Sequence, residues 1–214
     1  MGGLNGRQIL YANVPDWRKL ERAIHARFLT GTFAKGLAFV NAIGAEAEAA
    51  DHHPDLTLTY THVDISLLSH DADAVTDKDV ALAQKISHIA ADSGIGAAAW
   101  AVRSVAVGLD TADFATQGTF WSVLLTGDED SRDGDEIVDA DGNRLLWFQG
   151  TDAHPTPRQR FHLDVWLPHD VAETRVVAAV EAGGTLVSDA NAPSFWVLAD
   201  PEGNRVCVCT SLDR

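Results

Sequence analysis

The chain has 214 residues, which is enough for one large domain or two small ones, and its 46% hydrophobic and 22% charged residues are typical of a globular protein. Acidic residues outnumber basic ones by 31 to 16, for a formal net charge of −15. This balance argues against nucleic acid and anionic membranes as partners. The sequence also lacks a membrane-length apolar run and a signal-peptide pattern at its amino terminus, so we expect a cytoplasmic protein.

The first half of the chain predicts an α+β domain. Its patterns indicate, in order, a helix, a strand, a helix, a hairpin of two strands and a last helix, over residues 16–24, 27–33, 34–50, 56–67 and 77–91. Apolar residues at helical spacing support the second helix. Thr76 followed by Asp79 has the spacing of a capping box at the start of the last one. This order allows an antiparallel sheet with helices packed against it.

A small, glycine-containing segment near residue 95 reads as a linker, and we divide the chain into a domain at 1–95, a linker at 96–102 and a domain at 103–214. The second domain contains an internal repeat. A strand and a helix are predicted at 105–109 and 113–125, and again at 161–167 and 171–182. Similar turns follow at 139–144 and 200–205 and lead into a last strand each time.

Two further features of the second domain favour structural interpretations. The acid-rich stretch 128–141 fails as a calcium loop, because Gly142 at the sixth position would make Ile137 the first ligand, so we expect a solvated hairpin. The two cysteines, Cys207 and Cys209, alternate along one predicted strand, which is poor geometry for a disulfide. We expect both to be reduced, with a metal or redox pair as the alternative.

Histidines are concentrated in the first domain, where five of the nine fall within residues 52–88. Imidazole has an unperturbed pKa of about 6.5, so it can both donate and accept a proton near neutral pH. His52 and His53 follow a predicted helix and precede Pro54, and Glu48 lies one helical turn before His52. A zinc site is the alternative, although adjacent histidines rarely bind the same ion.

The run Glu48-x-x-x-His52-His53-Pro54, followed by Tyr60, His70 and Asp79 at fixed gaps, resembles the signature of the pterin-4a-carbinolamine dehydratase family over about residues 8–95. The resemblance implies an antiparallel four-stranded sheet with helices on one face. It also implies dehydration of a 4a-hydroxytetrahydropterin to quinonoid dihydropterin, a lyase reaction that needs no metal or other cofactor. By position, His52, His53 and His70 would be the catalytic acid and base groups, and Glu48 and Asp79 would orient them or bind the pterin.

The second domain resembles the glyoxalase and bleomycin-resistance (vicinal oxygen chelate) superfamily over about residues 102–212, with paired βαβββ repeats. In its metal-using members the ligands lie on the first and last strands of each repeat. The matching positions here are Val105, Leu146, His162 and Cys207. Valine and leucine cannot bind a metal, so we expect a metal-free binding or interaction module.

Two alternatives to a dehydratase stay open. The protein could be a binding or regulatory protein, since some animal members of the dehydratase family also act as dimerisation cofactors of a transcription factor. Alternatively, the second domain could be a metal-dependent isomerase or dioxygenase. Both families commonly self-associate, so by analogy we expect a homodimer that acts on a small pterin.

Overall fold

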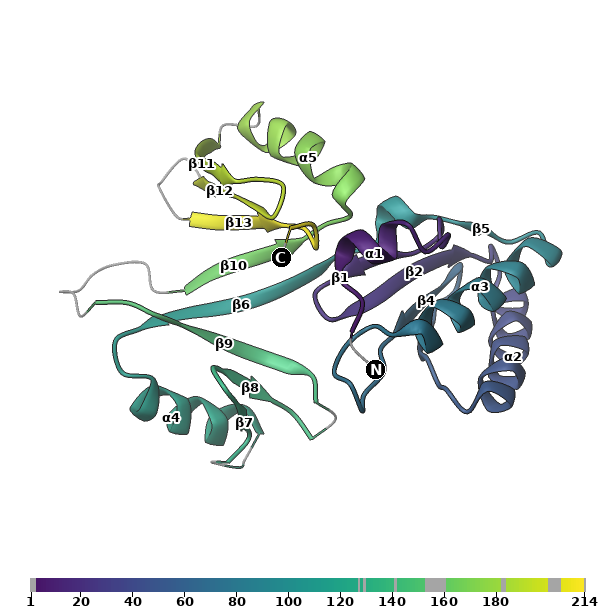
Figure 1. The fold of residues 1–214 in the computed structure, drawn as a ribbon, viewed down its shortest axis with the longest axis horizontal. Coiled ribbons are helices and arrows are strands. Elements are labelled where there is room, and N and C mark those ends of the chain that lie inside the picture. Colours follow the sequence, from purple (N-terminus) through teal and green to yellow (C-terminus); the bar gives the residue numbers. More distant parts are fainter. Residues whose placement is uncertain are drawn as a thin grey trace. The chain divides into compact units, whose positions relative to one another are not determined.

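The computed structural model describes residues 3–126, 128, 130–140, 142–152, 161–181, 184–199 and 205–213. The chain forms two compact units (Figure 1). Unit 1 comprises Met1–Ser104, Leu167–Thr174 and Thr210–Arg214, and unit 2 comprises Val105–Trp166 and Arg175–Cys209. Among the described helices, none combines the length and apolarity needed to cross a bilayer.

Unit 1 is built on an antiparallel sheet in the order β1-β2-β4-β3, with a short β5 that also pairs with β2. The α+β class and the antiparallel sheet expected from the sequence are confirmed. The elements of this region are α1 (Gly6–Leu10), β1 (Arg18–Leu20), β2 (Ala23–Leu29), α2 (Phe33–Ala50), β3 (Asp55–Leu58), β4 (His62–Leu67), α3 (Asp77–Asp92), β5 (Gly96–Ala97) and the 3-10 turn η1 (Ala99–Ala101).

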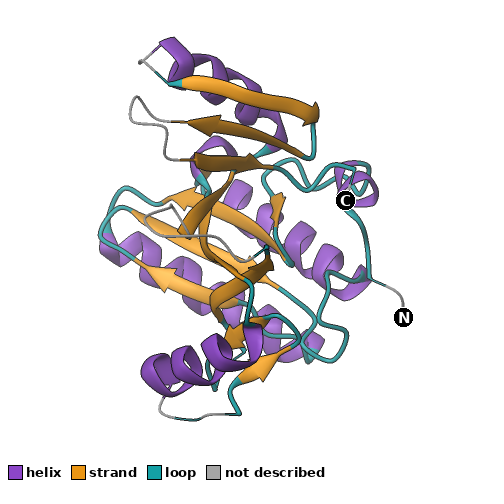
Figure 2. Ribbon diagram, turned by 90° about the vertical axis from the view of Figure 1, so that its left-hand side faces the viewer, coloured by secondary structure: helices purple, strands orange, loops and turns teal. Residues whose placement is uncertain are grey.

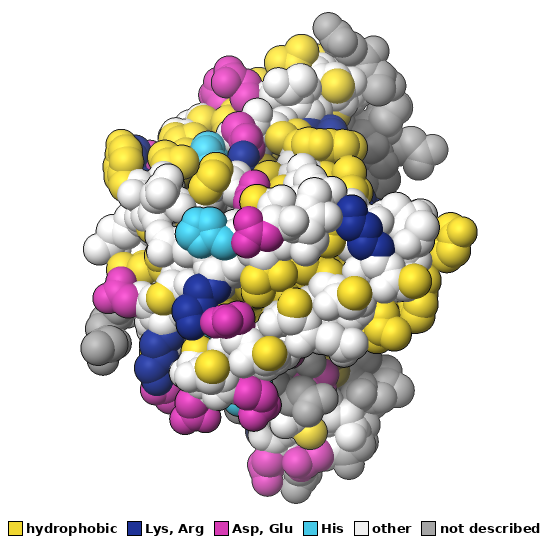
Figure 3. All heavy atoms as spheres, turned by 90° about the vertical axis from the view of Figure 1, so that its right-hand side faces the viewer, with side chains coloured by type: hydrophobic (Ala, Val, Ile, Leu, Met, Phe, Trp, Pro, Cys, Tyr) yellow, Lys and Arg dark blue, Asp and Glu magenta, His cyan; other side chains and the backbone are white. Residues whose placement is uncertain are grey.

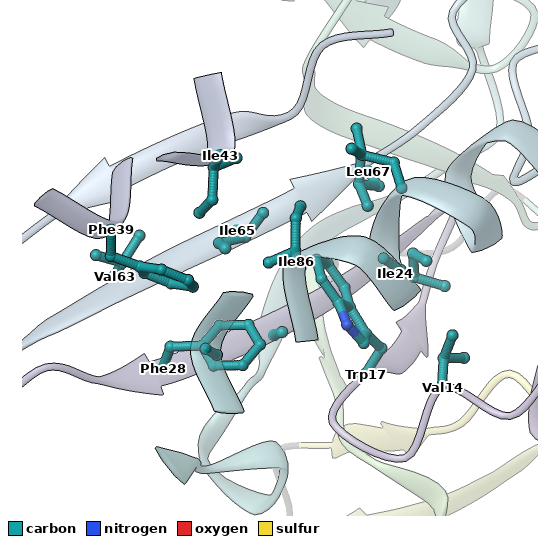
Figure 4. Close-up of a cluster of buried hydrophobic side chains, with 14 of the residues drawn as sticks. Val14, Trp17, Ile24, Phe28, Phe39, Ile43, Val63, Ile65, Leu67 and Ile86 are labelled. Atoms are coloured by element: carbon teal, nitrogen blue, oxygen red, sulfur yellow. The ribbon is translucent and has the colours of Figure 1, made fainter. Parts of the chain in front are cut away.

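Helices α2 and α3 cover the same face of this sheet. Their apolar side chains and the inward side chains of β2 and β4 form one buried cluster (Figure 4). Phe28 is completely buried in this cluster, and its ring makes edge-to-face contacts with Trp17, at 6.1 Å between centroids, and with Phe39, at 5.3 Å. Because strand side chains alternate between faces, the opposite face of the sheet carries the polar residues of β2 and β4.

The sequence prediction was wrong at the start of this domain. Residues 16–24 do not form a helix; they contribute β1 and the beginning of β2, joined by a two-residue turn in which Glu21 has a φ of 51°. Trp17, Leu20 and Ile24 have helical spacing, but the turn brings them into the core from two antiparallel segments. The next strand ends at Leu29 instead of continuing to residue 33, since Thr32 caps α2 through the amide of Lys35.

Unit 2 contains two strand-helix-strand-strand-strand repeats in one sheet, with the order β11-β12-β13-β10-β6-β9-β8-β7. This confirms the repeat expected from the sequence. The elements of this half of the chain are β6 (Ser104–Thr111), α4 (Phe114–Thr126), β7 (Arg132–Asp133), β8 (Glu136–Val138), β9 (Arg144–Gly150), β10 (Phe161–Trp166), α5 (His169–Glu181), β11 (Thr185–Asn191), β12 (Phe195–Ala199) and β13 (Arg205–Cys209). The start of α5, up to Thr174, belongs to unit 1. Within each repeat the first and last strands are parallel neighbours.

Helix α4 packs on β8 and β9 over a small apolar core. Figure 2 shows the helices of the chain in purple and its strands in orange. Within the described part of the acid-rich stretch, β7 and β8 pair as a hairpin, as expected. Cys207 and Cys209 lie on β13 and are not joined in a disulfide. The second predicted turn, at 200–204, lies outside the described residues. On the face drawn in Figure 3, acidic and basic side chains lie next to one another instead of forming one basic surface.

Candidate functional site

A left-handed turn at the end of α2 positions the histidine pair. Asp51 has φ 47° and ψ 45°. Its amide donates to the Glu48 carbonyl, and the next amide, of His52, donates to the Ala47 carbonyl at 3.2 Å. These two bonds form a Schellman motif, in which aspartate takes the place usually filled by glycine. The motif turns the chain sharply out of α2, so His52 leaves the helix at a fixed point.

His52 contacts a buried carboxylate. Its Nε2 lies 2.8 Å from Oδ1 of Asp79, and the His52 side chain is 11% exposed while that of Asp79 is completely buried. An ionised carboxylate only accepts hydrogen bonds, so the tautomer that suits this contact carries its proton on Nε2. Nδ1 of His52 is then the ring nitrogen available to accept a proton.

Asp79 combines two roles through its two oxygens. Its Oδ2 accepts hydrogen bonds from the Thr76 amide at 2.7 Å, the Thr76 hydroxyl at 3.1 Å and the Ser69 hydroxyl at 2.7 Å. The capping box predicted from the sequence is therefore present at the start of α3. Because Oδ2 completes the cap, Oδ1 is left to hold His52. Asp79 thus lies behind the imidazole of His52 and is not exposed to solvent.

The second histidine of the pair is in a different environment. His53 places Nε2 3.0 Å from Oε1 of Glu48, and these side chains are 58% and 79% exposed. Pro54 restricts His53 to extended backbone, which directs it away from the end of the helix. His53 and Glu48 are therefore both accessible to a ligand from solvent.

His70 lies in the exposed turn between β4 and α3. The residue before it, Ser69, bridges to Ala74 across this turn and donates to Asp79, so the backbone of His70 lies near the carboxylate that holds His52. The structure therefore brings His52 into direct contact with Asp79, and His53 into contact with Glu48. His70 is linked to the first of these pairs through its neighbour Ser69. Tyr60 is 74% exposed.

Sequence reasoning missed Ser69. It carries no motif of its own, and its hydroxyl reaches Asp79 only because the 70–73 turn folds back onto the start of α3. A small hydroxyl residue directly before a candidate catalytic histidine was the available signal.

Unit 2 contains a histidine, His162, that lies between two carboxylates. This residue is on β10; its Nδ1 is 3.2 Å from Oδ1 of Asp110, and its Nε2 is 3.7 Å from Oδ1 of Asp164. The Trp147 ring packs edge-on against the imidazole, with 5.0 Å between the centroids. The His162 side chain is 13% exposed.

These residues do not fit the metal site that the resemblance to the glyoxalase superfamily implies. Val105 and Leu146 have no ligating atom, and Leu146 belongs to the apolar core. Within the described ranges, no group of three or more His, Cys, Asp or Glu side chains has an arrangement able to hold a metal ion.

Comparisons with known proteins match both halves of the chain. A family model described as "Pterin 4 alpha carbinolamine dehydratase" matches residues 5–89, and one described as "Glyoxalase-like domain" matches residues 106–209. A Thermomicrobium roseum protein named "Putative pterin-4-alpha-carbinolamine dehydratase" is 36% identical over 81 residues, which are 38% of this chain and 87% of that protein. A protein of the same name from Picosynechococcus sp. is 41% identical over 76 residues, covering 36% of this chain and 83% of its own.

A solved structure from Brucella melitensis, described as a transcriptional coactivator/pterin dehydratase, is 29% identical with a TM-score of 0.40, and covers 42% of this chain and 99% of its own. The two family resemblances drawn from the sequence are confirmed by the family models, each in the half of the chain where it was expected.

Proposed function

The chain belongs to the pterin-4a-carbinolamine dehydratase family, and on that premise we propose that its first domain, at 1–95, converts a 4a-hydroxytetrahydropterin to quinonoid dihydropterin and water. In this reaction the C4a–O bond breaks as the hydroxyl takes up a proton. The N5–H bond also breaks, and its electron pair forms the C4a=N5 double bond. The reaction therefore needs one proton donor and one proton acceptor, which imidazoles can supply.

The contact between His52 and the buried Asp79 is the observation that carries this proposal. A carboxylate behind an imidazole fixes the orientation of the ring and the position of its proton, as in the hydrolase triads. His52 is a proposed acid or base group, and Asp79 is a positioning residue. From the sequence, Asp79 could either orient a histidine or bind the pterin. Because the Asp79 side chain is buried, the structure supports the orienting role.

His53 and His70 complete the proposed acid and base groups. Both are exposed, so they can reach a substrate that approaches from solvent. Glu48, 3.0 Å from His53, can orient that ring or accept a hydrogen bond from the amino group of a pterin. The pH dependence of the dehydration rate in variants of the three histidines would show which one donates the proton and which one accepts it.

The test is the rate of 4a-hydroxytetrahydrobiopterin dehydration, followed by ultraviolet absorbance, for the wild type and for His52→Ala, His53→Ala and His70→Ala. The wild type is expected to accelerate the reaction and each variant to lose rate while keeping its circular dichroism spectrum. His88→Ala, at an exposed position of α3, is the matched control and should keep full activity. A wild type that only matches the uncatalysed rate would instead favour the binding-protein alternative.

For the second domain, at 103–214 after a linker at 96–102, we propose a metal-free binding module. The apolar residues at two of the four ligand positions support this function. Metal analysis of the protein after mild purification tests it. Stoichiometric metal that is lost in His162→Ala would favour the metal-dependent alternative. We also propose a homodimer, to be measured by sedimentation equilibrium.

A further inference from the structure

Unit 1 contains a second polar site, on the face of its sheet opposite α2 and α3. A cavity of about 300 Å³ lies on this face, and we call it the open-face cavity. Its lining includes side chains of β2, β3 and β4 and the segment Ala101–Arg103. The polar lining residues of β2 and β4 alternate along each strand with buried apolar ones, so their side chains point away from the apolar core.

The strand register aligns the polar side chains of this cavity in two rows. In one row, Ser66 lies between His25 on β2 and Asp55 on β3. In the next row, Asp64 is paired with Arg27 on β2 and with Thr57 on β3. Side chains directly opposite each other on antiparallel strands lie on the same face. The floor of the cavity therefore offers an imidazole and two hydroxyl groups.

Most of the charge in the cavity is already neutralised. Arg27 donates two hydrogen bonds to Asp64, each of 2.6 Å, which uses both carboxylate oxygens. Burial lowers the pKa of His25 below its usual value, so this imidazole is neutral at pH 7.

Two lining charges remain, and they have opposite sign. The side chains of Asp55 and Arg103 make no hydrogen bond or ion pair with any residue in the described part of the chain. Asp55 lies on β3, and β4 runs between β3 and β2, so the backbones of β3 and β2 are about 10 Å apart at the usual strand spacing. The cavity therefore presents an anionic group, a cationic group and neutral hydrogen-bonding groups on one floor.

The open-face cavity is separate from the proposed dehydratase site. It shares no residue with Glu48, His52, His53, His70 or Asp79. Ala101–Arg103 lie between the two matched ranges, 5–89 and 106–209. The segment is held in place by β5, which pairs with β2, and by the Ala98 amide, which donates to the Arg27 carbonyl at 2.7 Å.

We propose that the open-face cavity binds a small zwitterion, a free α-amino acid with a neutral polar side chain. Its ammonium group pairs with Asp55 and its carboxylate with Arg103, both through charge-assisted hydrogen bonds. Ser66, Thr57 and His25 supply partners for a polar side chain. A volume of about 300 Å³ is at the small end of ligand cavities, which suits a ligand of this size.

The experiment titrates the full-length protein with L-serine, L-threonine, L-asparagine and L-glutamine by isothermal titration calorimetry at pH 7.5. At least one of them is expected to bind. For each amino acid that binds, its amide lacks the carboxylate and its N-acetyl derivative lacks the ammonium group, as L-glutaminamide and N-acetyl-L-glutamine do for L-glutamine, so neither derivative should bind more than weakly. Asp55→Asn and Arg103→Gln should each weaken binding by about tenfold or more, the usual effect of losing a charged hydrogen-bond partner.

Asp92→Asn, at the exposed end of α3, removes the same charge as Asp55→Asn away from the cavity and should leave binding unchanged. The proposal is overturned if none of the four amino acids binds. It is equally overturned if the amide or the N-acetyl derivative binds as tightly as its parent amino acid, or if binding is unaffected in the Asp55 and Arg103 variants. The dehydration rate of the two variants is measured in parallel, so a failure here is distinct from a failure of the proposed activity.

Discussion

The two units each hold a histidine beside carboxylates, but the groups around the two histidines differ. In unit 1, Asp79 is bound on one oxygen by Ser69 and Thr76 and on the other by His52. In unit 2, His162 lies within 4 Å of Asp110 and Asp164, yet the buried Oδ1 of Asp110 and the indole nitrogen of Trp147 have no hydrogen-bond partner among the described residues.

A histidine and a carboxylate do not by themselves make a reactive pair. A buried carboxylate positions its partner when its remaining acceptor sites are satisfied, because each bond restricts its rotation. Asp79 meets this condition and Asp110 does not. We therefore expect the acid and base chemistry of this protein to reside in unit 1.

The largest expected effect separates the two histidines directly. His52→Ala should lower the rate of dehydration by about 10²- to 10⁴-fold, the usual contribution of a general acid or base. His162→Ala should leave the rate at the wild-type level. Both variants are assayed with the same pterin substrate, with thermal unfolding as the check on folding. An equal loss of activity in the two variants would contradict the comparison.

A smaller loss is expected when the positioning carboxylate is changed. Asp79→Asn keeps the shape of the side chain but replaces one acceptor oxygen with a donor, so His52 loses its fixed orientation. We expect kcat to fall by about 10²-fold with little change in KM, because the ring is misaligned while the pterin still binds. The pH profile of kcat should also shift. A variant with unaltered kcat and pH profile would reduce Asp79 to a helix cap.

Stability measurements compare the surroundings of the two carboxylates. Ser69→Ala removes a buried donor to Asp79 and should lower the free energy of unfolding by about 1–3 kcal/mol. Asp110→Asn keeps the volume of the side chain and an oxygen that can face Nδ1 of His162, so its cost should stay below about 1 kcal/mol. Urea denaturation of the two variants gives both values. The reverse order of costs would mean that Asp110 is the better satisfied of the two carboxylates.

The smallest effect concerns His25, a third histidine, whose pKa is lowered chiefly by burial. As pH falls below about 6.5, the unfolded chain binds a proton at this residue that the folded chain does not, so stability falls with decreasing pH. The loss is at most about 1.4 kcal/mol for each pH unit. Urea denaturation at pH 7.5 and 5.5 should show a greater loss for the wild type than for His25→Gln, whereas equal losses would mean that His25 does not titrate in this range.

Parts of the fold were predictable because local patterns agree with the tertiary structure. The second and third helices were placed to within one or two residues, since their caps and apolar spacing are local signals. The strand at Arg18–Leu20 was not predictable, because the apolar spacing of residues 16–24 fits a helix. The segment becomes a strand only because it pairs with β2, which local spacing does not show. The short α1 was missed because a helix of 5 residues has too few positions to show a period.

The sequence alone indicated the two family resemblances, the α+β class, the repeated second domain and the set of candidate residues. These could be read from the chain because motif spacing, such as the fixed gaps between the histidines, Tyr60 and Asp79, is a property of the sequence. Only the tertiary structure decided which of these residues touch. It placed Asp79 behind His52, added Ser69 to the pair, and brought Asp55 and Arg103 to one cavity. Contacts of this kind depend on how distant segments pack, and no local pattern records that.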